Sequence, residues 1–559
     1  MKLKKIFILL LLITFTLNTL CGPYAFAYDY YAPGGDTPGT PGEGGGKGEP
    51  GNPACDESKS NPAQGCPTKD NPSEPKGECS GAEPINFYDG KFYYNHTFME
   101  ISGAIPIKIT ANYSEFSVFN GPLGYGWSLN YDIRLFSTAD GNLLMRRGDA
   151  TKSVYISQGD GNYLLNNQEG YEVITRHPDG TYTLEYKNGR KFEFDLNGVI
   201  TKISDSNDNS LIFSYDPSGK LPIIGISPFS TITTPIVIGY DYRLVRIEEA
   251  KAGITSGRYV NFDYNSNGRI VRVVDFENRE VLFVYDSSDN GDLIHIEDPA
   301  QNQFDYVYNE HKMTEFFGGC CGAVYSPHTN IYDDSGRVIQ QIHGNNITNI
   351  DYTDYKKITT VTTQIYDDLG SLLNTQTDIY NFNNQGFSTL HVKIMGTGLD
   401  ALTGEQNDIA INFAYDEKNR VITKSLPMGS MQYEYDDRGN IIKVIKQINN
   451  VDTLTTDYTY DINNNLISRV VSASNDSDTY TTNFSYDANH NRLTEEKVID
   501  VSTTYITTYT YTAQGEIDTV TDPKGNITKY EYDQYGNMIK TYDPNNPTKK
   551  TDYTYDSLG

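Results

Sequence analysis

The sequence predicts an all-β protein built as a long run of antiparallel hairpins. Its main evidence is a recurring phrase of aromatic, any residue, aromatic and Asp, followed by a short turn, as in Tyr433-Glu434-Tyr435-Asp436. The last six copies are spaced 25, 26, 25, 21 and 23 residues apart and are centred on Tyr435, Tyr460, Tyr486, Tyr511, Tyr532 and Tyr555. A fixed period of this size is typical of a repeat architecture. Tyr, Phe, Thr, Val and Ile dominate the flanking stretches, as expected of half-buried strands.

Each copy of the phrase predicts a strand that ends in a tight turn. Aromatic residues at alternate positions share one face of a strand, because side chains alternate with period two. The Asp-x-x-Gly that follows is typical of a type I turn closed by a residue at positive φ. Where Gly is missing, the position holds Asn419, Asn464 or His490, residue types that are enriched at positive φ. We therefore interpret His490 as a turn residue and not as a catalytic one.

A second turn completes the repeat, as in Asp522-Pro523-Lys524-Gly525. Each period is then two strands and two turns, and neighbouring hairpins must pair because one hairpin alone is marginal in water. Looser copies precede the regular ones, centred on Phe194, Tyr215, Tyr264, Tyr285, Tyr332, Tyr366 and Tyr415. The repeated residues therefore predict a scaffold and not a site.

The N-terminus resembles a secretory signal peptide over residues 1–27. Lys2, Lys4 and Lys5 precede an apolar stretch, and Ala25-Phe26-Ala27 fits a small-x-small cleavage site. Cys21 raises the alternative of a lipoprotein anchor, but Asn18-Thr19-Leu20 fits that signal poorly. No later stretch approaches 18 apolar residues, so we expect no transmembrane span.

Residues 28–82 are predicted to be a disordered linker. The segment from Tyr28 to Gly81 holds 9 of the 24 Pro and 12 of the 49 Gly, and it cannot bury enough apolar surface to offset its ordering entropy. Cys55, Cys66 and Cys79 lie in it. In an oxidising compartment two of them can pair, but the connectivity is not readable. The alternative is a zinc site, but the long spacings between these Cys residues and the lack of nearby His disfavour it.

Residues 83–190 are predicted to form a small β-rich domain ahead of the repeats. The segment 86–94 is typical of a hairpin with its turn at Gly90, and 105–113 of a strand. Gly124-Tyr125-Gly126-Trp127-Ser128 contains the only Trp of the chain. Glycines among bulky aromatics indicate close backbone approach or tight bends. Trp127 is thus expected to anchor a core, and a ligand platform is the alternative.

These motifs together resemble a known family. The repeats resemble the RHS or YD repeats of secreted bacterial proteins and of the teneurins, which assigns residues 191–559 to such repeats. Pro84-Ile85-Asn86, Gly90 to Tyr94 and Gly124 to Ser128 resemble the domain that commonly precedes RHS repeats. The resemblance implies a spiral β-sheet that coils into a hollow shell. In related proteins that shell can enclose a C-terminal toxic effector, after a closing segment that often cleaves itself through an aspartate.

The last residues fall inside a repeat turn, at Tyr555-Asp556-Ser557-Leu558-Gly559. An unpaired half-hairpin would leave an open strand edge. We therefore expect the sequence to be the N-terminal part of a longer protein.

Two segments suggest metal chemistry. Cys320 and Cys321 lie between His311 and His328, but structural zinc sites usually space their Cys by two to four residues. The segment 205–209, Asp-Ser-Asn-Asp-Asn, alternates oxygen ligands like a calcium loop, yet Ser210 replaces the Gly that such loops need. We interpret the first as a Gly-rich bend and the second as a turn, and we expect no catalytic, cofactor-binding or metal-binding residue in this chain.

The formal net charge is −28, which argues against nucleic-acid binding because phosphates require basic patches. The sequence therefore favours a secreted, non-catalytic scaffold. Its own C-terminal effector domain is an expected partner. The alternative is a surface protein that binds cell-wall polysaccharide or cell-surface glycan, for which Thr, Asn, Asp and exposed Tyr are suited. An enzyme within 83–190 is the least favoured hypothesis.

Overall fold

The computed structural model describes residues 85–115, 120–149, 151–166, 172–225, 236–251, 253–287, 291–318, 327–394, 408–427, 429–449, 451–500, 502–543 and 546–555. The chain divides into two compact units, Met1–Ala82 and Glu83–Gly559. The first unit holds the expected leader, the linker and Cys55, Cys66 and Cys79, and it lies outside the described residues. No helix occurs among the described residues of the second unit, which confirms the all-β prediction.

Two small sheets open the second unit, and we call residues 85–129 the plug. One sheet has the strand order β1-β2-β3-β6, and the other pairs β4 with β5. The hairpin expected at Gly90 is present, since the Gly90 amide donates to the Asn86 carbonyl at 2.7 Å. The strands are β1 (Ile85–Asn86), β2 (Lys91–Ile101), β3 (Ile107–Ser114), β4 (Asn120–Gly121), β5 (Gly124–Tyr125) and β6 (Trp127–Leu129).

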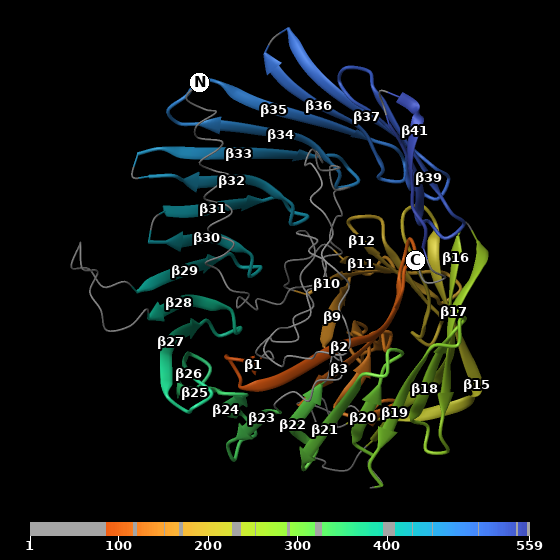
Figure 1. Ribbon diagram of the computed structural model, residues 1–559, viewed down its shortest axis with the longest axis vertical. Coiled ribbons are helices and arrows are strands. Elements are labelled where there is room, and N and C mark those ends of the chain that lie inside the picture. The colour runs from red at the N-terminus through yellow and green to blue at the C-terminus, as the bar shows by residue number, and fades with distance from the viewer. Residues whose placement is uncertain are drawn as a thin grey trace. The chain divides into compact units, whose positions relative to one another are not determined.

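A single antiparallel sheet of 35 strands, which we call the wall, follows from β7 to β41. Each strand pairs with its neighbours in sequence, and Figure 1 shows the strands following one another around a curve. Arg134 of β7 adds an isolated bridge to Val199, whereas no described ladder joins β41 to β7, so the wall winds as an open band. The boundary expected at residue 190 falls inside the wall, between β12 (Tyr182–Tyr186) and β13 (Lys191–Phe194), which pair.

The first part of the wall precedes the regular repeats. Its strands are β7 (Arg134–Ser137), β8 (Leu143–Arg146), β9 (Lys152–Ser157), β10 (Asn162–Leu165), β11 (Glu172–Arg176), β12 (Tyr182–Tyr186), β13 (Lys191–Phe194), β14 (Ile200–Ser204), β15 (Asn209–Gly225), β16 (Ile236–Lys251), β17 (Ile254–Tyr264), β18 (Ile270–Asp275), β19 (Glu280–Tyr285), β20 (Leu293–Glu297), β21 (Gln303–Asn309) and β22 (Lys312–Gly318).

The second part contains the most regular repeats. Its strands are β23 (His328–Tyr332), β24 (Val338–His343), β25 (Asn346–Asp354), β26 (Ile358–Tyr366), β27 (Leu372–Phe382), β28 (Ser388–Ile394), β29 (Ile409–Tyr415), β30 (Val421–Leu426), β31 (Gly429–Tyr435), β32 (Ile441–Gln447), β33 (Thr453–Tyr460), β34 (Leu466–Ala473), β35 (Thr479–Tyr486), β36 (Arg492–Asp500), β37 (Thr503–Tyr511), β38 (Ile517–Thr521), β39 (Ile527–Tyr532), β40 (Met538–Asp543) and β41 (Asn546–Asp552).

The turn after each repeat is held by its aspartate. In the Asp436 turn, the Gly439 amide donates to the Asp436 carbonyl at 3.1 Å, and the Asp436 amide donates to the Asn440 carbonyl at 3.0 Å. The carboxylate Oδ1 of Asp436 accepts the backbone amides of Arg438 and Asn440 at 3.0 and 2.7 Å. Asp thus satisfies the donors of the turn it opens. The predicted turn chemistry is confirmed.

The residue that closes the turn has positive φ whatever its side chain. Gly439 has φ 74°, and Asn419, Asn464 and His490 have φ 61°, 65° and 66°. The prediction that these non-Gly residues are selected for backbone geometry is therefore confirmed. The second turn of the repeat, closed by Gly525 at φ 86°, also forms where the sequence predicts it, with the same pattern of hydrogen bonds.

Late repeats lie against early ones along a line of turns that we call the seam. Asn207 and Asn491 exchange side-chain amide hydrogen bonds of 3.1 and 2.9 Å, although 284 residues separate them. Lys251 pairs with Glu516 at 3.4 Å, and the Arg258 guanidinium lies 3.8 Å from the ring centroid of Tyr535. Figure 1 shows the blue strands of the late repeats next to β16 and β17. The wall therefore coils back upon itself through polar contacts between turns.

Candidate functional site

The second tyrosine of twelve described repeats makes a hydrogen bond that its aromatic character alone does not predict. Its hydroxyl donates to a backbone carbonyl of the preceding hairpin, at 2.6–3.1 Å. The pairs are Tyr264–Leu244, Tyr285–Ile270, Tyr308–Leu293, Tyr332–Met313, Tyr352–Val338, Tyr415–Ser388, Tyr435–Val421, Tyr460–Ile441, Tyr486–Leu466, Tyr511–Arg492, Tyr532–Ile517 and Tyr555–Met538.

These carbonyls lie where the ladder is disturbed. The register shifts between Glu434 and Tyr435, where Tyr435 pairs with Ile441, and the carbonyl of Ile441 accepts the hydroxyl of the next repeat's Tyr460. A β-bulge disrupts the ladder locally. Each phenol therefore supplies a donor at the bulge of the repeat before it, and consecutive repeats are coupled by hydrogen bonds as well as by packing.

The repeat pattern predicts packing for both aromatics of the phrase and does not by itself predict this hydrogen bond. The signal was present: the first aromatic varies between Phe and Tyr, as at Phe283, Phe413 and Tyr433, whereas the second is Tyr in every regular copy. Tyr308 and Tyr352 were missed as repeat tyrosines because Asn309 and Thr353 replace the Asp that follows.

Replacing Tyr435 with Phe is expected to lower the free energy of unfolding by about 1–2 kcal/mol, because the Val421 carbonyl loses its 2.8 Å donor. Tyr433 is the matched control. It lies two residues away on the same face, and its hydroxyl contacts the Met431 sulfur at 3.5 Å and makes no described hydrogen bond to a backbone carbonyl. Tyr433→Phe should lower the free energy of unfolding, measured with urea, by less than about 0.5 kcal/mol. Equal losses for the two variants would contradict the assigned role.

Alkaline pH is expected to unfold the wall by ionising the same tyrosine hydroxyls. Burial raises the pKa of Tyr460, Tyr511 and Tyr532 to about 12 each, from an ordinary value of 10.0. A raised folded-state pKa means that their stabilisation is fully present below pH 10 and is lost as the pH rises towards 12. We expect the phenolate absorbance and the β circular dichroism to change together in that window. Ionisation at pH 10 with the β signal intact would contradict this expectation.

The plug is anchored to the wall through an aromatic cluster. Trp127 is fully buried, and its ring centroid lies 5.9 Å from Tyr94 and 5.0 Å from Tyr306 of β21. Its indole N–H donates at 2.9 Å to the hydroxyl of Tyr308, which in turn donates to Leu293. The prediction that Trp127 anchors a core is confirmed.

Glycines let this anchor approach the wall closely. A Cβ on Gly124, which has φ +98°, would lie 2.8 Å from the Gly291 carbonyl oxygen of the wall. A Cβ on Gly126, which has φ +77°, would lie 2.8 Å from the Tyr113 ring. The close approach expected of this motif is therefore present.

The plug also bonds to the turns of the wall. The Tyr113 hydroxyl donates to the His311 carbonyl at 2.9 Å and accepts the Met313 amide at 3.0 Å. The Val338 amide donates to the Gly90 carbonyl at 3.0 Å. These bonds fix the plug along β22 to β24, so plug and wall act as one packed body there.

Two family descriptions match the chain. RHS Repeat matches residues 511–548, where Tyr511 and Tyr532 make the hydrogen bonds described above. This chain therefore contains an RHS repeat. A domain of unknown function, DUF6531, matches residues 82–155, which span the plug and the first wall strands.

Three solved structures illustrate what the RHS-repeat protein is similar to. The TcdB2-TccC3-TEV crystal structure is 12% identical, covering 83% of this chain and 31% of that one, with a TM-score of 0.25. The Photorhabdus luminescens Tc holotoxin pore is 11% identical, covering 78% and 29%, with a TM-score of 0.23. The N-terminal domain of the effector SpvB from Salmonella typhimurium is 12% identical, covering 65% and 100%, with a TM-score of 0.16. The chain thus spans about 30% of the length of the first two of these chains. No curated protein matches it in sequence.

The calcium-like segment of the RHS-repeat protein is a turn, as predicted. Asp205 Oδ1 accepts the amides of Asn207 and Asn209 at 2.9 Å each, and its Oδ2 accepts the Asn209 side chain at 2.7 Å. Burial raises the pKa of Asp205. The carboxylate is therefore engaged within its own turn. His490 likewise serves its turn, and its Nδ1 bonds to the Asn465 side chain at 2.8 Å beside the seam.

The histidines that flank the Cys pair do not converge. His311 Nδ1 bonds to Asp292 at 2.8 Å and its ring stacks on Tyr125 at 4.4 Å. His328 stacks on Phe316 and His343. Cys320 and Cys321 lie outside the described residues. Across the described ranges no group of three or more His, Cys, Asp or Glu side chains could hold a metal ion.

The described part of the RHS-repeat protein also contains no helix with the length and apolar content to cross a bilayer.

Proposed function

We propose that this RHS-repeat protein is the non-catalytic wall and plug of a secreted shell that encloses an effector polypeptide. The proposal rests on one observation: the plug covers one face of the wall along the early strands but does not cover the same face along the late strands. The plug covers this face from β17 to β27, where buried apolar residues follow one another as far as Tyr380. Beyond Tyr380, the only buried large apolar side chain among the described residues is that of Tyr509.

The uncovered face continues the one that the plug covers. Tyr380 stacks on Phe87 of the plug at 5.0 Å and pairs with His391 of β28, which pairs with Ile411 of β29. Ile411 shares its face with Phe413, two residues on, which pairs with Lys424 of β30. Lys424 pairs in turn with Met431 of β31. Register pairs share a face, so the plug-facing side reaches the late repeats.

On that side the late strands carry a largely apolar row that the described residues leave partly exposed. Tyr433, Val444, Thr456, Val471 and Tyr480 pair in succession from β31 to β35. Their side chains are half-buried or exposed, and Tyr480 is 43% exposed. A contiguous apolar face of this kind marks an interaction surface. A polypeptide with apolar segments is the ligand that such a face fits.

The proposed role assigns no chemistry to this chain. Secretion is supported by the leader pattern of residues 1–27. No feature of the described residues favours binding of cell-wall carbohydrate over binding of a polypeptide.

Site-specific photo-crosslinking in the secreted, full protein tests the proposal. A photoreactive residue at Val444 faces the plug side of β32, and one at Ile445 faces the opposite side and is the matched control. We expect Val444 to crosslink to a polypeptide that lies outside the wall and the plug, and Ile445 not to do so. Equal crosslinking at both positions, or products confined to the wall, would refute enclosure.

A further inference from the structure

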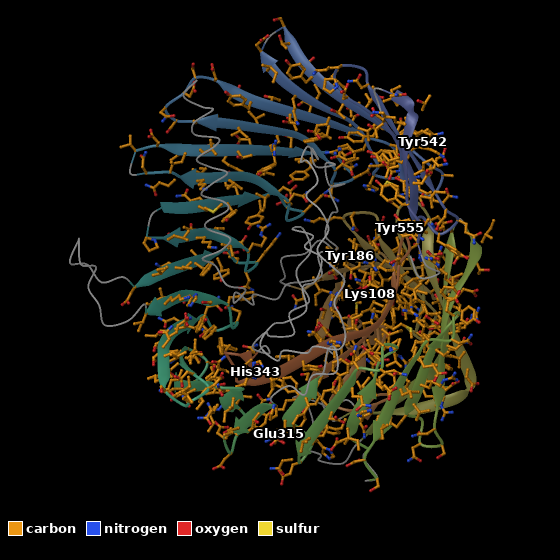
Figure 2. The ribbon with its side chains drawn as sticks, viewed as in Figure 1. Lys108, Tyr186, Glu315, His343, Tyr542 and Tyr555 are labelled. Atoms are coloured by element: carbon orange, nitrogen blue, oxygen red, sulfur yellow. The ribbon has the colours of Figure 1, made fainter. Side chains whose placement is uncertain are left out.

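Three aromatic rings form a row across adjacent wall strands where the plug docks. Phe316 of β22 pairs with His328 of β23, which pairs with His343 of β24. The ring centroids of Phe316 and His328 are 4.3 Å apart and those of His328 and His343 are 3.6 Å apart, with interplanar angles of 17° and 16°. Figure 2 labels His343 on this part of the wall.

The row ends on the plug. Phe316 is buried, and its ring lies 5.9 Å from Phe92 and 5.2 Å from Tyr94, both of β2. Tyr94 contacts Trp127 and Tyr306 in the anchor described above. The two histidines therefore extend this row along the same face of the wall, beside the residue against which the plug packs.

The two histidines lack the carboxylate partners that other histidines have. All eight histidines lie within the described residues, and three of them contact an Asp at 2.6–2.8 Å, namely His295, His311 and His391. His328 and His343 make no such contact, and the buried Nδ1 of His328 has no hydrogen-bond partner.

The strands around the pair present neutral groups to it. On β23 and β24, Asn330 and Gln341 bond to each other at 3.0 Å, and on β25, Asn346 pairs with His343. Glu315 of β22 is adjacent to Phe316 and so points to the opposite face. Of the described titratable side chains on these four strands, only His343 affects the pKa of His328.

We propose that the Phe316–His328–His343 row is an acid-sensitive latch: neutral imidazoles hold Phe316 against the plug, and their protonation loosens the plug from the wall. This goes beyond enclosure, because it concerns how plug and wall separate and does not depend on the cargo. Two imidazolium rings in face-to-face contact repel each other, and no carboxylate of the surrounding strands compensates them.

The direction of the pH dependence follows from the pair's surroundings. Burial and the neighbouring His343 lower the pKa of His328 to about 4, and burial lowers the pKa of His343. The unfolded chain binds a proton at each imidazole near pH 6.5, whereas folded His328 resists its proton until about pH 4. The stability that depends on the neutral pair is thus present above pH 6.5 and is lost as the pH falls towards 4.

Two plug residues also titrate. Burial lowers the pKa of His96, which packs on Phe304 of the wall at 4.6 Å and acts in the same direction as the pair, but it is unchanged in every variant below. Glu115 acts in the opposite direction. Burial raises the pKa of Glu115 to about 7, partly offset by Lys312. A carboxyl with a raised pKa loses its stabilising effect as the pH rises, so Glu115 cannot cause loosening in acid. It is also unchanged in every variant below, and comparison between variants therefore isolates the histidines.

The single tryptophan makes the test direct. Trp127 is the only Trp, and it lies in the anchor that Phe316 supports, so its fluorescence reports plug docking without a label. The emission of the full chain is followed from pH 7 to pH 3.5 in the wild type, His343→Gln, His343→Phe and His328→Phe. His177→Gln is the control, because His177 bonds to Thr183 outside the plug contact.

We expect each latch variant to move the midpoint of the Trp127 transition to lower pH by about half a unit or more, and the control to leave it unchanged. His343→Gln retains a polar side chain of similar reach, so the test stands even where a Phe variant fails to fold. Unmoved midpoints in the latch variants would overturn the proposal. So would stabilisation of the wild type by Zn²⁺ at pH 7 that His343→Gln abolishes, since the pair would then be metal ligands.

Discussion

Replacing Trp127 with Ala is expected to lower the free energy of unfolding by about 3–5 kcal/mol, the range for truncating a large aromatic in a core. Trp127 is fully buried against Tyr94, Tyr113 and Tyr306, at centroid distances of 5.9, 5.4 and 5.0 Å. Its removal leaves a cavity between plug and wall and takes a donor from Tyr308. Urea unfolding followed by circular dichroism measures the loss.

Trp127→Phe separates packing from hydrogen bonding. It keeps an aromatic ring in the cluster but removes the N–H that bonds to Tyr308, so a loss of about 1–2 kcal/mol is expected. If the free energy of unfolding of Trp127→Ala were within about 1 kcal/mol of the wild-type value, the plug would not be an anchored part of the fold.

Gly198→Ala is expected to destabilise the protein by about 3 kcal/mol or more, because it combines backbone strain with a clash. Gly198 has φ +76°, and a Cβ there would lie 2.1 Å from the carbonyl oxygen of Leu135. The Leu135 amide also donates to the Gly198 carbonyl at 2.9 Å, so this contact ties β7 to the turn between β13 and β14. Thermal unfolding of the purified variant measures the effect.

Gly141→Ala isolates the contribution of strain alone. Gly141 has nearly the same φ, +81°, but no atom lies within 4 Å of the position where its Cβ would be. A loss of about 1 kcal/mol is expected there, from the positive φ. If both variants lost the same stability, the contact between β7 and the turn that joins β13 to β14 would contribute nothing.

Much of the local structure could be predicted, because the chemistry that specifies it is local. Asp436 accepts amides two and four residues ahead of it, and the left-handed position is filled by Gly, Asn or His for steric reasons. Period two placed Tyr433 and Tyr435 on one face. The all-β prediction and the interpretation of His490 follow from such short-range rules.

The hydrogen bonds made by the hydroxyls of the repeat tyrosines could be predicted only in part. Tyr460 and the Ile441 carbonyl are 19 residues apart, one hairpin away, and only the register places them together. The invariance of Tyr at that position was a usable signal. At Tyr308 and Tyr352 the same bond forms without the Asp, so the motif alone could not find them.

By itself, the sequence determined the hairpins, their turns and the face that each aromatic occupies, since these depend on residues within one repeat. Only the tertiary structure decided which turns meet at the seam, where Asn207 meets Asn491, and that Phe316, His328 and His343 stack beside the plug. Such contacts depend on how many strands complete a coil and on the register summed over all of them. No single repeat encodes that sum.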